Sequence, residues 1–126
     1  MSAHNIVHIE IPSRDAKANA KFYGDAFGWK LSVDPTFDYW QFAPASGPGG
    51  AFPGLSDEMG TKPGEVLVYV GTDDIEASLA KIESLGGKTL MPKTEIPGIG
   101  WFAFFSDLTG NRLALYTNLH PASNAG

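Results

Sequence analysis

Residues 8–31 read HIEIPSRDAKANAKFYGDAFGWKL, and this stretch decides the fold because it joins a strand directly to a helix. Ile9 and Ile11 alternate with His8 and Glu10, a period of two that is typical of a strand with one face in the core. The segment therefore predicts an amphipathic strand that is followed by a short polar connection.

The helix after this strand is marked at both ends. Ser13 is the predicted N-cap, and Asp15 suits the positive end of the helix dipole. Gly28 is the predicted stop, because glycine adopts the left-handed conformation that ends many helices. Between them, apolar side chains recur on one helical face at the positions Ala16, Ala20, Tyr23 and Phe27.

Residues 68–88, VYVGTDDIEASLAKIESLGGK, repeat the same order of elements. A strand of alternating valines leads to Thr72 or Asp73 as the predicted cap, and the following helix ends at Gly86. The interval from Asp15 to Gly28 equals that from Asp73 to Gly86. The sequence thus predicts an internal repeat that rests on element order rather than on residue identity.

Short strands follow each predicted helix, so each half is expected to form a β-α-β-β-β module. We expect strands at WKLSV, DYWQFA and GGAF in the first half, and at KTLM, WFAFFS and RLALYT in the second. The predicted organisation is one domain over 1–118, made of module 3–52 and module 63–118, with a Gly/Pro-rich linker at 43–64 and a flexible tail at 119–126.

Composition limits the classes of partner. The net charge is −5 and lysines and arginines do not cluster, which disfavours nucleic acids and anionic membranes. The chain has no cysteine, which excludes disulfides and thiolate metal sites. No apolar run approaches the ~20 residues of a membrane span. We expect a cytoplasmic protein whose partner is a small molecule.

Three stretches together resemble the vicinal oxygen chelate superfamily, also called the glyoxalase/bleomycin resistance/dioxygenase superfamily. They are the two quoted above and GWFAFFSDLTGNRLALY at residues 100–116, which is similar to the family's strand, turn and final strand. The F-G-W ending of the first helix and the Pro/Gly-rich middle look most like its glyoxalase-like branch. Leu108 stands where the family's turn usually has proline.

The resemblance implies an α+β fold in which two tandem βαβββ modules form a curled mixed sheet around a cavity, with the helices on the convex face. Side-chain parity then places the apolar rows under the helices, at Val7/Ile9/Ile11, Val66/Val68/Val70 and Leu113/Leu115. The expected cavity wall consists of His8, Glu10, Trp40, Leu67, Tyr69, Trp101, Arg112, Ala114 and Tyr116.

Enzymes of this superfamily typically hold a divalent metal with about four side chains, and most of those ligands are missing from this chain. His8 is the only residue that matches a ligand position. The other positions fall on Leu67, on Ala114 and near Ala51, none of which carries a donor atom. We therefore expect no metal and no other cofactor.

Several alternatives for the polar residues remain open. His8 and Glu10, with His4 on the same face, could form a makeshift metal site, or His8 could simply line the cavity. Glu10 could be solvated, could pair with Arg112, or could act as a metal-independent acid or base with Tyr69 or Tyr116.

These observations favour a metal-independent protein that binds an aromatic or cationic small molecule and forms a homodimer. The alternative is an enzyme, either a glyoxalase I-like lyase or isomerase or a dioxygenase, with an atypical site for Zn, Ni, Mn or Fe. Whether any reaction is catalysed stays open, with binding favoured. A third possibility is an interaction module that has lost both metal and ligand.

Overall fold

The computed structural model describes residues 4–119, which form two helices and eight strands. They divide into an N-terminal unit, residues 7–67, and a C-terminal unit, whose described residues are 4–6 and 68–119. In chain order the elements are β1 (Ile6–Glu10), α1 (Ala16–Phe27), β2 (Lys30–Asp34), β3 (Tyr39–Ala43), β4 (Gly50–Ala51), β5 (Leu67–Gly71), α2 (Ile75–Ser84), β6 (Lys88–Ile96), β7 (Gly100–Ser106) and β8 (Arg112–Asn118). The predicted α+β fold with the β-α-β-β-β order in each half is confirmed.

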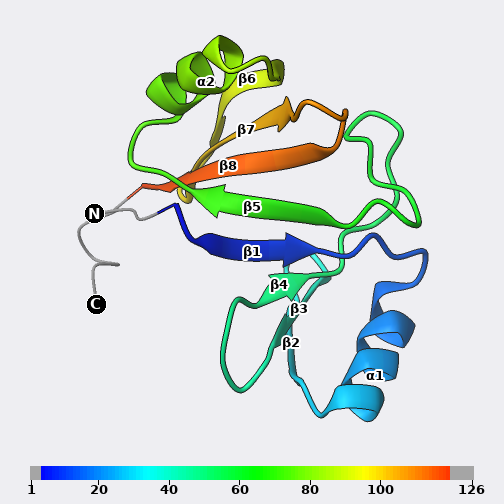
Figure 1. Cartoon of the computed structure of the whole chain (residues 1–126). Coiled ribbons are helices and arrows are strands. Elements are labelled where there is room, and N and C mark those ends of the chain that lie inside the picture. The colour runs from blue at the N-terminus through cyan, green and yellow to red at the C-terminus, as the bar shows by residue number, and fades with distance from the viewer. Residues whose placement is uncertain (1–3, 120–126) are drawn as a thin grey trace. The chain divides into compact units, whose positions relative to one another are not determined.

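The sheet of the N-terminal unit has the strand order β2-β3-β4-β1 (Figure 1). β1 and β4 run parallel, with Glu10 opposite Ala51, whereas β3 pairs antiparallel with both β2 and β4. We expected the Gly/Pro-rich stretch to hide at most a short edge strand. β4 is short, but it lies between β3 and β1 in the middle of the sheet.

Helix α1 packs on one face of this sheet through an aromatic core. Ala20, Phe42 and Phe52 are buried there, and Ile9 and Ile11 pack against them. The rings of Trp29 and Phe42 stack with their centroids 4.6 Å apart. The expected position of Ile9 and Ile11 under the helix is therefore correct. Val7 differs, because it is 42% exposed and does not belong to this cluster.

The residue that caps each helix lies one or two positions after the predicted N-cap. Asp15, rather than Ser13, caps α1 and accepts a hydrogen bond from the backbone N–H of Ala18. Asp74, rather than Thr72 or Asp73, caps α2 in the same way. In each case the carboxylate accepts from the backbone N–H three residues later, which is a donor that the helix leaves unpaired. Gly28, with φ 74°, ends α1 as expected.

The sheet of the C-terminal unit has the order β5-β8-β7-β6, with β5 and β8 parallel and the other pairs antiparallel. Helix α2 covers one face, where Ile75, Leu79, Ala103 and Leu115 are buried and Val70 packs against them. Val66, which we expected in this row, is 51% exposed and precedes β5. The apolar row under α2 therefore begins after Val66, later than the alternation of valines predicted.

The turn between β7 and β8 is held by Asp107 rather than by a proline. One carboxylate oxygen accepts hydrogen bonds from the backbone N–H groups of Thr109, Gly110 and Asn111, each 2.9 Å long. Bonds from the Asn111 side chain and from these backbone groups lower the pKa of Asp107. Leu108 is 79% exposed, so it contributes little to the rigidity of the turn.

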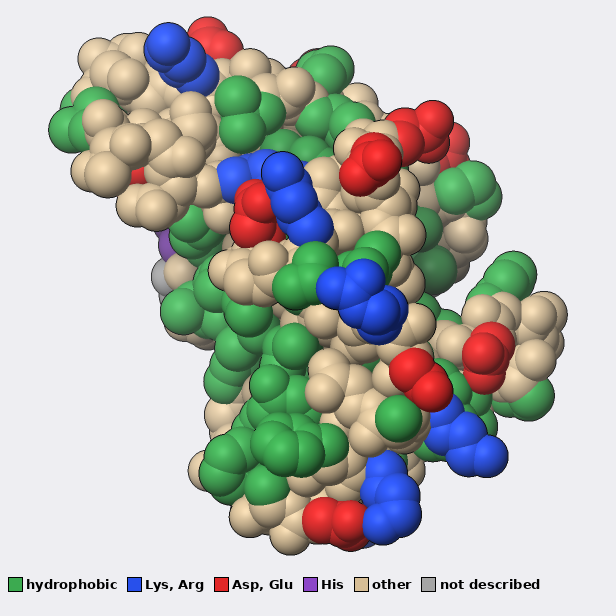
Figure 2. Space-filling model, turned by 90° about the vertical axis from the view of Figure 1, so that its right-hand side faces the viewer, with side chains coloured by type: hydrophobic (Ala, Val, Ile, Leu, Met, Phe, Trp, Pro, Cys, Tyr) green, Lys and Arg blue, Asp and Glu red, His purple; other side chains and the backbone are tan. Residues whose placement is uncertain are grey.

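Charged side chains are interspersed on the face shown in Figure 2, where lysines and arginines alternate with aspartates and glutamates. Within residues 4–119, no helix is long and apolar enough to cross a membrane. The expected flexible tail lies outside the described residues, apart from Leu119.

Candidate functional site

One face of the N-terminal sheet carries polar side chains in a row across its four strands. Ser32 on β2 pairs with Gln41 on β3, Gln41 pairs with Ala51 on β4, and Ala51 pairs with Glu10 on β1. Partners in register point to the same side of a sheet. A hydroxyl, a carboxamide, a methyl group and a carboxylate therefore lie in one line, on the face opposite the helix. We call this surface the polar face.

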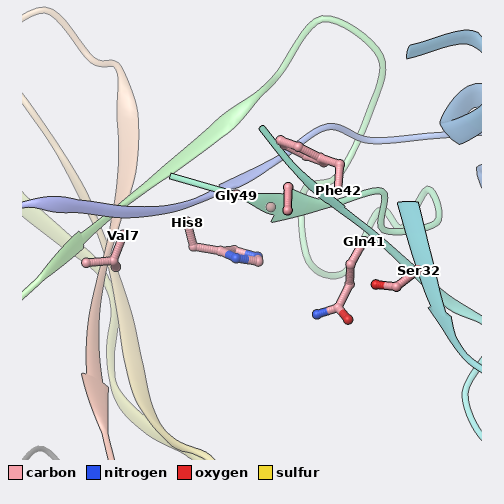
Figure 3. A pocket seen from close by; sticks show the side chains of 8 residues that line it. Val7, His8, Ser32, Gln41, Phe42 and Gly49 are labelled. Atoms are coloured by element: carbon pink, nitrogen blue, oxygen red, sulfur yellow. The ribbon is translucent and has the colours of Figure 1, made fainter. Parts of the chain in front are cut away.

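A pocket of about 320 Å³ opens on this unit. Its lining comes from β1 (Val7 and His8), β2 (Ser32), β3 (Gln41, Phe42 and Ala43) and the start of β4 (Gly49 and Gly50). Figure 3 shows the side chains of His8, Ser32 and Gln41 on one side of the strands and the Phe42 ring on the other. Ala43 and Gly49 have small or no side chains, so they leave space between the larger polar groups.

Glu10 lies beside the pocket and contacts two other polar side chains. Its Oε2 atom is 3.4 Å from His8 Nε2 and accepts a hydrogen bond of 3.4 Å from the Tyr39 hydroxyl. The side chains of His8 and Glu10 are 28% and 16% exposed, so both are half-buried. Contacts of this length are weak, since strong bonds to carboxylates are shorter. Glu10 thus brings negative charge to the polar face.

The environment of Tyr39 strongly favours its protonated form. Burial is the main cause that raises the pKa of Tyr39 above its ordinary value, and the charge of Glu10 and the hydrogen bond to Glu10 add to the shift. A neutral phenol is the form that can donate to a carboxylate. Tyr39 therefore acts as a donor that supports the position of Glu10.

We expect Tyr39 to keep its proton at a pH where an ordinary tyrosine has ionised. Because its pKa is higher in the folded state, Tyr39 stabilises the fold below pH ~10, and this contribution is lost as the pH rises through the raised pKa. The free energy of unfolding should fall more steeply above that pH in the native chain than in Tyr39→Phe. Glu10→Gln should shift the last tyrosinate absorbance to lower pH, and an unchanged titration would contradict this assignment.

The two tryptophans expected in the cavity wall lie on the helix side of their sheets. Trp40 packs against the α1 core and Trp101 against the α2 core. The reason is parity, because Trp40 is two residues from the buried Phe42 and Trp101 is two residues from the buried Ala103. This placement corrects the expectation for both residues.

The other face of the C-terminal sheet carries the remaining predicted residues. Tyr69 pairs with Ala114 across β5 and β8, and Ala114 pairs with Phe104 on β7. The guanidinium of Arg112 lies 4.7 Å from the centre of the Phe104 ring. Burial raises the pKa of Tyr116, whose hydroxyl donates to Asn118 at 3.0 Å. These groups form an aromatic face with one cation.

Sequence reasoning missed three residues of the N-terminal polar face, namely Ser32, Tyr39 and Gln41. The signal was present in the alternation of Ser32 with apolar Leu31 and Val33, and of Gln41 with Trp40 and Phe42. The aromatic residues of DYWQFA favoured Trp40 as the predicted site residue, although the polar residues at every second position mark the face away from the core.

The side chains at three of the family's ligand positions do not fit a divalent metal, and His8 is the exception. Ala51 is fully buried between Gln41 and Glu10, and Ala114 is fully buried beside Tyr69. Leu67 is 3% exposed at the start of β5. Across residues 4–119, no three His, Asp or Glu side chains are grouped as a metal site. His4 has φ 56°, outside the strand range, so the β1 alternation does not extend to it.

Comparisons with known proteins agree with this fold. A glyoxylase-like domain-containing protein of Didymella fabae is 33% identical over 86% of this chain and 90% of its own length. The anthracycline biosynthesis protein DnrV of Streptomyces peucetius is 31% identical over 85% of this chain, which spans 44% of that protein.

Among solved structures, the methylmalonyl-CoA epimerase from Mycobacterium tuberculosis matches with a TM-score of 0.68, over 96% of this chain and 92% of that chain. At 16% sequence identity this likeness concerns the fold alone. The family model described as the glyoxalase/bleomycin resistance protein/dioxygenase superfamily matches residues 5–115. The chain therefore belongs to the glyoxalase/bleomycin resistance protein/dioxygenase superfamily.

Proposed function

We propose that this protein binds an aromatic or cationic small molecule on the polar face of its N-terminal unit and needs no metal to do so. The chemistry of the family's ligand positions supports binding without a metal. His8 offers one imidazole there, whereas Ala51, Leu67 and Ala114 offer hydrocarbon. One imidazole with water holds a divalent ion too weakly, since such ions require several N or O ligands in fixed geometry.

The pocket supports binding of an organic ligand instead. It combines apolar lining from Val7 and Ala43 with hydrogen-bonding groups from His8, Ser32 and Gln41, which is the usual mixture of a small-molecule site. Glu10 lies beside the pocket, with its Oε2 atom 3.4 Å from His8 Nε2, and the net charge of the chain is −5. Both features favour a cationic over an anionic ligand.

Charge preference can be tested with benzamidine and benzoate, which have the same size and opposite charges. We expect benzamidine to bind about 10-fold more tightly, the scale of one charge-assisted contact. Glu10→Gln should remove most of this preference, as measured by NMR titration. Glu58→Gln removes the same charge from an exposed loop position and should leave the preference unchanged. Tighter binding of benzoate, abolished by Arg112→Ala, would contradict the cationic assignment.

The alternative function is a glyoxalase-like lyase, isomerase or dioxygenase with an atypical metal site. The similarity to the Didymella relative, which is named a glyoxylase-like domain-containing protein, favours this second candidate. The proximity of His8 and Glu10 also favours it. This alternative function requires about one equivalent of bound metal per chain, and that metal should be lost in His8→Ala. Failure of every aromatic or cationic probe to bind, with no metal present, would favour an interaction module instead.

We expect the protein to form a homodimer. β2 and β6 each end their unit's strand order, and edge strands expose unpaired backbone groups that are commonly covered by a partner. Light scattering at micromolar concentration should give about twice the 13.5 kDa chain mass. A mass of one chain over that range would refute the expectation.

A further inference from the structure

We propose that Gln41 is the residue that determines ligand specificity in the N-terminal pocket, and that it selects molecules with an amide-type edge, meaning a carbonyl acceptor beside an N–H donor. The inference rests on the proposed binding function and goes beyond charge preference. Gln41 lines the pocket, and its carboxamide lies on the same side of the strands as His8 (Figure 3).

The position of Gln41 is fixed by the sheet rather than by a mobile loop. Gln41 pairs with Ser32 on one side and with Ala51 on the other, so its Cα is held from two neighbouring strands. Its neighbours Trp40 and Phe42 are anchored in the α1 core. The carboxamide therefore starts from a rigid backbone, which lowers the entropy that ordering it on a ligand would cost.

The surroundings leave room for a ligand group at this carboxamide. Ala43, two residues from Gln41 on β3, is exposed and ends in a methyl group, and Gly49, which also lines the pocket, has no side chain. No side-chain hydrogen bond joins Gln41 or Ser32 to another residue in the described part of the chain. Both groups can therefore turn to a ligand without breaking a bond within the protein.

The chemistry of a carboxamide defines its best partner. It presents one carbonyl acceptor and two N–H donors in one plane, so a planar amide, imide or lactam can both donate and accept in the same contact. The adjacent Ser32 hydroxyl can donate or accept as required. A ketone of equal shape offers only the acceptor, so it would leave the carbonyl of Gln41 without a donor.

Gln41 also provides a direct spectroscopic test, because it is the only glutamine in the sequence. Protein labelled with ¹⁵N in the glutamine side chain should show a single NH₂ pair of signals. Benzamide should shift this pair and bind about fivefold more tightly than acetophenone, which replaces the NH₂ by a methyl group. Gln41→Leu should make the affinities for benzamide and acetophenone equal, whereas the preference for benzamidine over benzoate should persist.

A second variant separates specificity from folding. Gln41→Glu keeps the length and shape of the side chain and removes its donors, so benzamide should lose its advantage while benzamidine binds more tightly. Ser84→Ala, on the exposed side of α2, should change neither affinity. If benzamidine binds with the expected dependence on Glu10 but benzamide and acetophenone bind equally, the inference about Gln41 is overturned and the binding function stands. If none of the four probes binds, both fail.

Discussion

Gly50→Ala is expected to cost on the order of 4 kcal/mol or more in the free energy of unfolding, a large part of the ~5–15 kcal/mol that stabilises a typical domain. A Cβ atom at this position would overlap the carbonyl oxygen of Ile9 and the ring of Phe42. The oxygen belongs to the backbone of β1, and Phe42 is 5% exposed in the α1 core, so neither can move away cheaply. Urea denaturation should show the loss.

Gly54→Ala provides the matched control, because it lies four residues later in the same unit and a Cβ atom there would meet nothing within 4 Å. Its free energy of unfolding should change by less than about 1 kcal/mol. Equal stability of Gly50→Ala and Gly54→Ala would show that β4 does not pack closely against β1. The polar face would then lose the strand that separates Gln41 from Glu10.

Much of the fold could be predicted from the sequence because its signals are local. The alternation around Ile9, the helix stop at Gly28 and the repeat of both features after residue 66 depend on neighbours in the chain. The exact caps could not be fixed in advance, since Ser13, Asp15, Thr72, Asp73 and Asp74 are all residue types that cap helices. Which of them accepts a backbone N–H is decided by where the helix begins.

The site was predicted less completely, because it depends on contacts between distant residues. His8 and Glu10 could be placed on one face from alternation alone. Their neighbours Tyr39 and Gln41 are about 30 residues away, and their approach depends on the register of β3 with the two-residue strand β4. A strand that short has no periodicity of its own, so the sequence carries almost no signal for this register.

We expect the protein to bind no divalent metal tightly. Protein purified without chelator should contain less than about one tenth of an equivalent of Zn, Ni, Mn or Fe. The physical reason is that Leu67, Ala114 and Ala51 are hydrocarbon where a coordination shell would need oxygen or nitrogen. His8→Ala should therefore leave the metal content unchanged, as should His4→Ala, its control outside β1.

Elemental analysis of the purified protein, performed on the same sample in which benzamidine binding is measured, tests the metal-independent binding proposal most directly. We expect saturable binding of benzamidine by protein that holds a negligible amount of divalent metal, and an unchanged dissociation constant after treatment with EDTA. About one equivalent of metal, lost in His8→Ala together with benzamidine binding, would contradict it and would establish the atypical metal site.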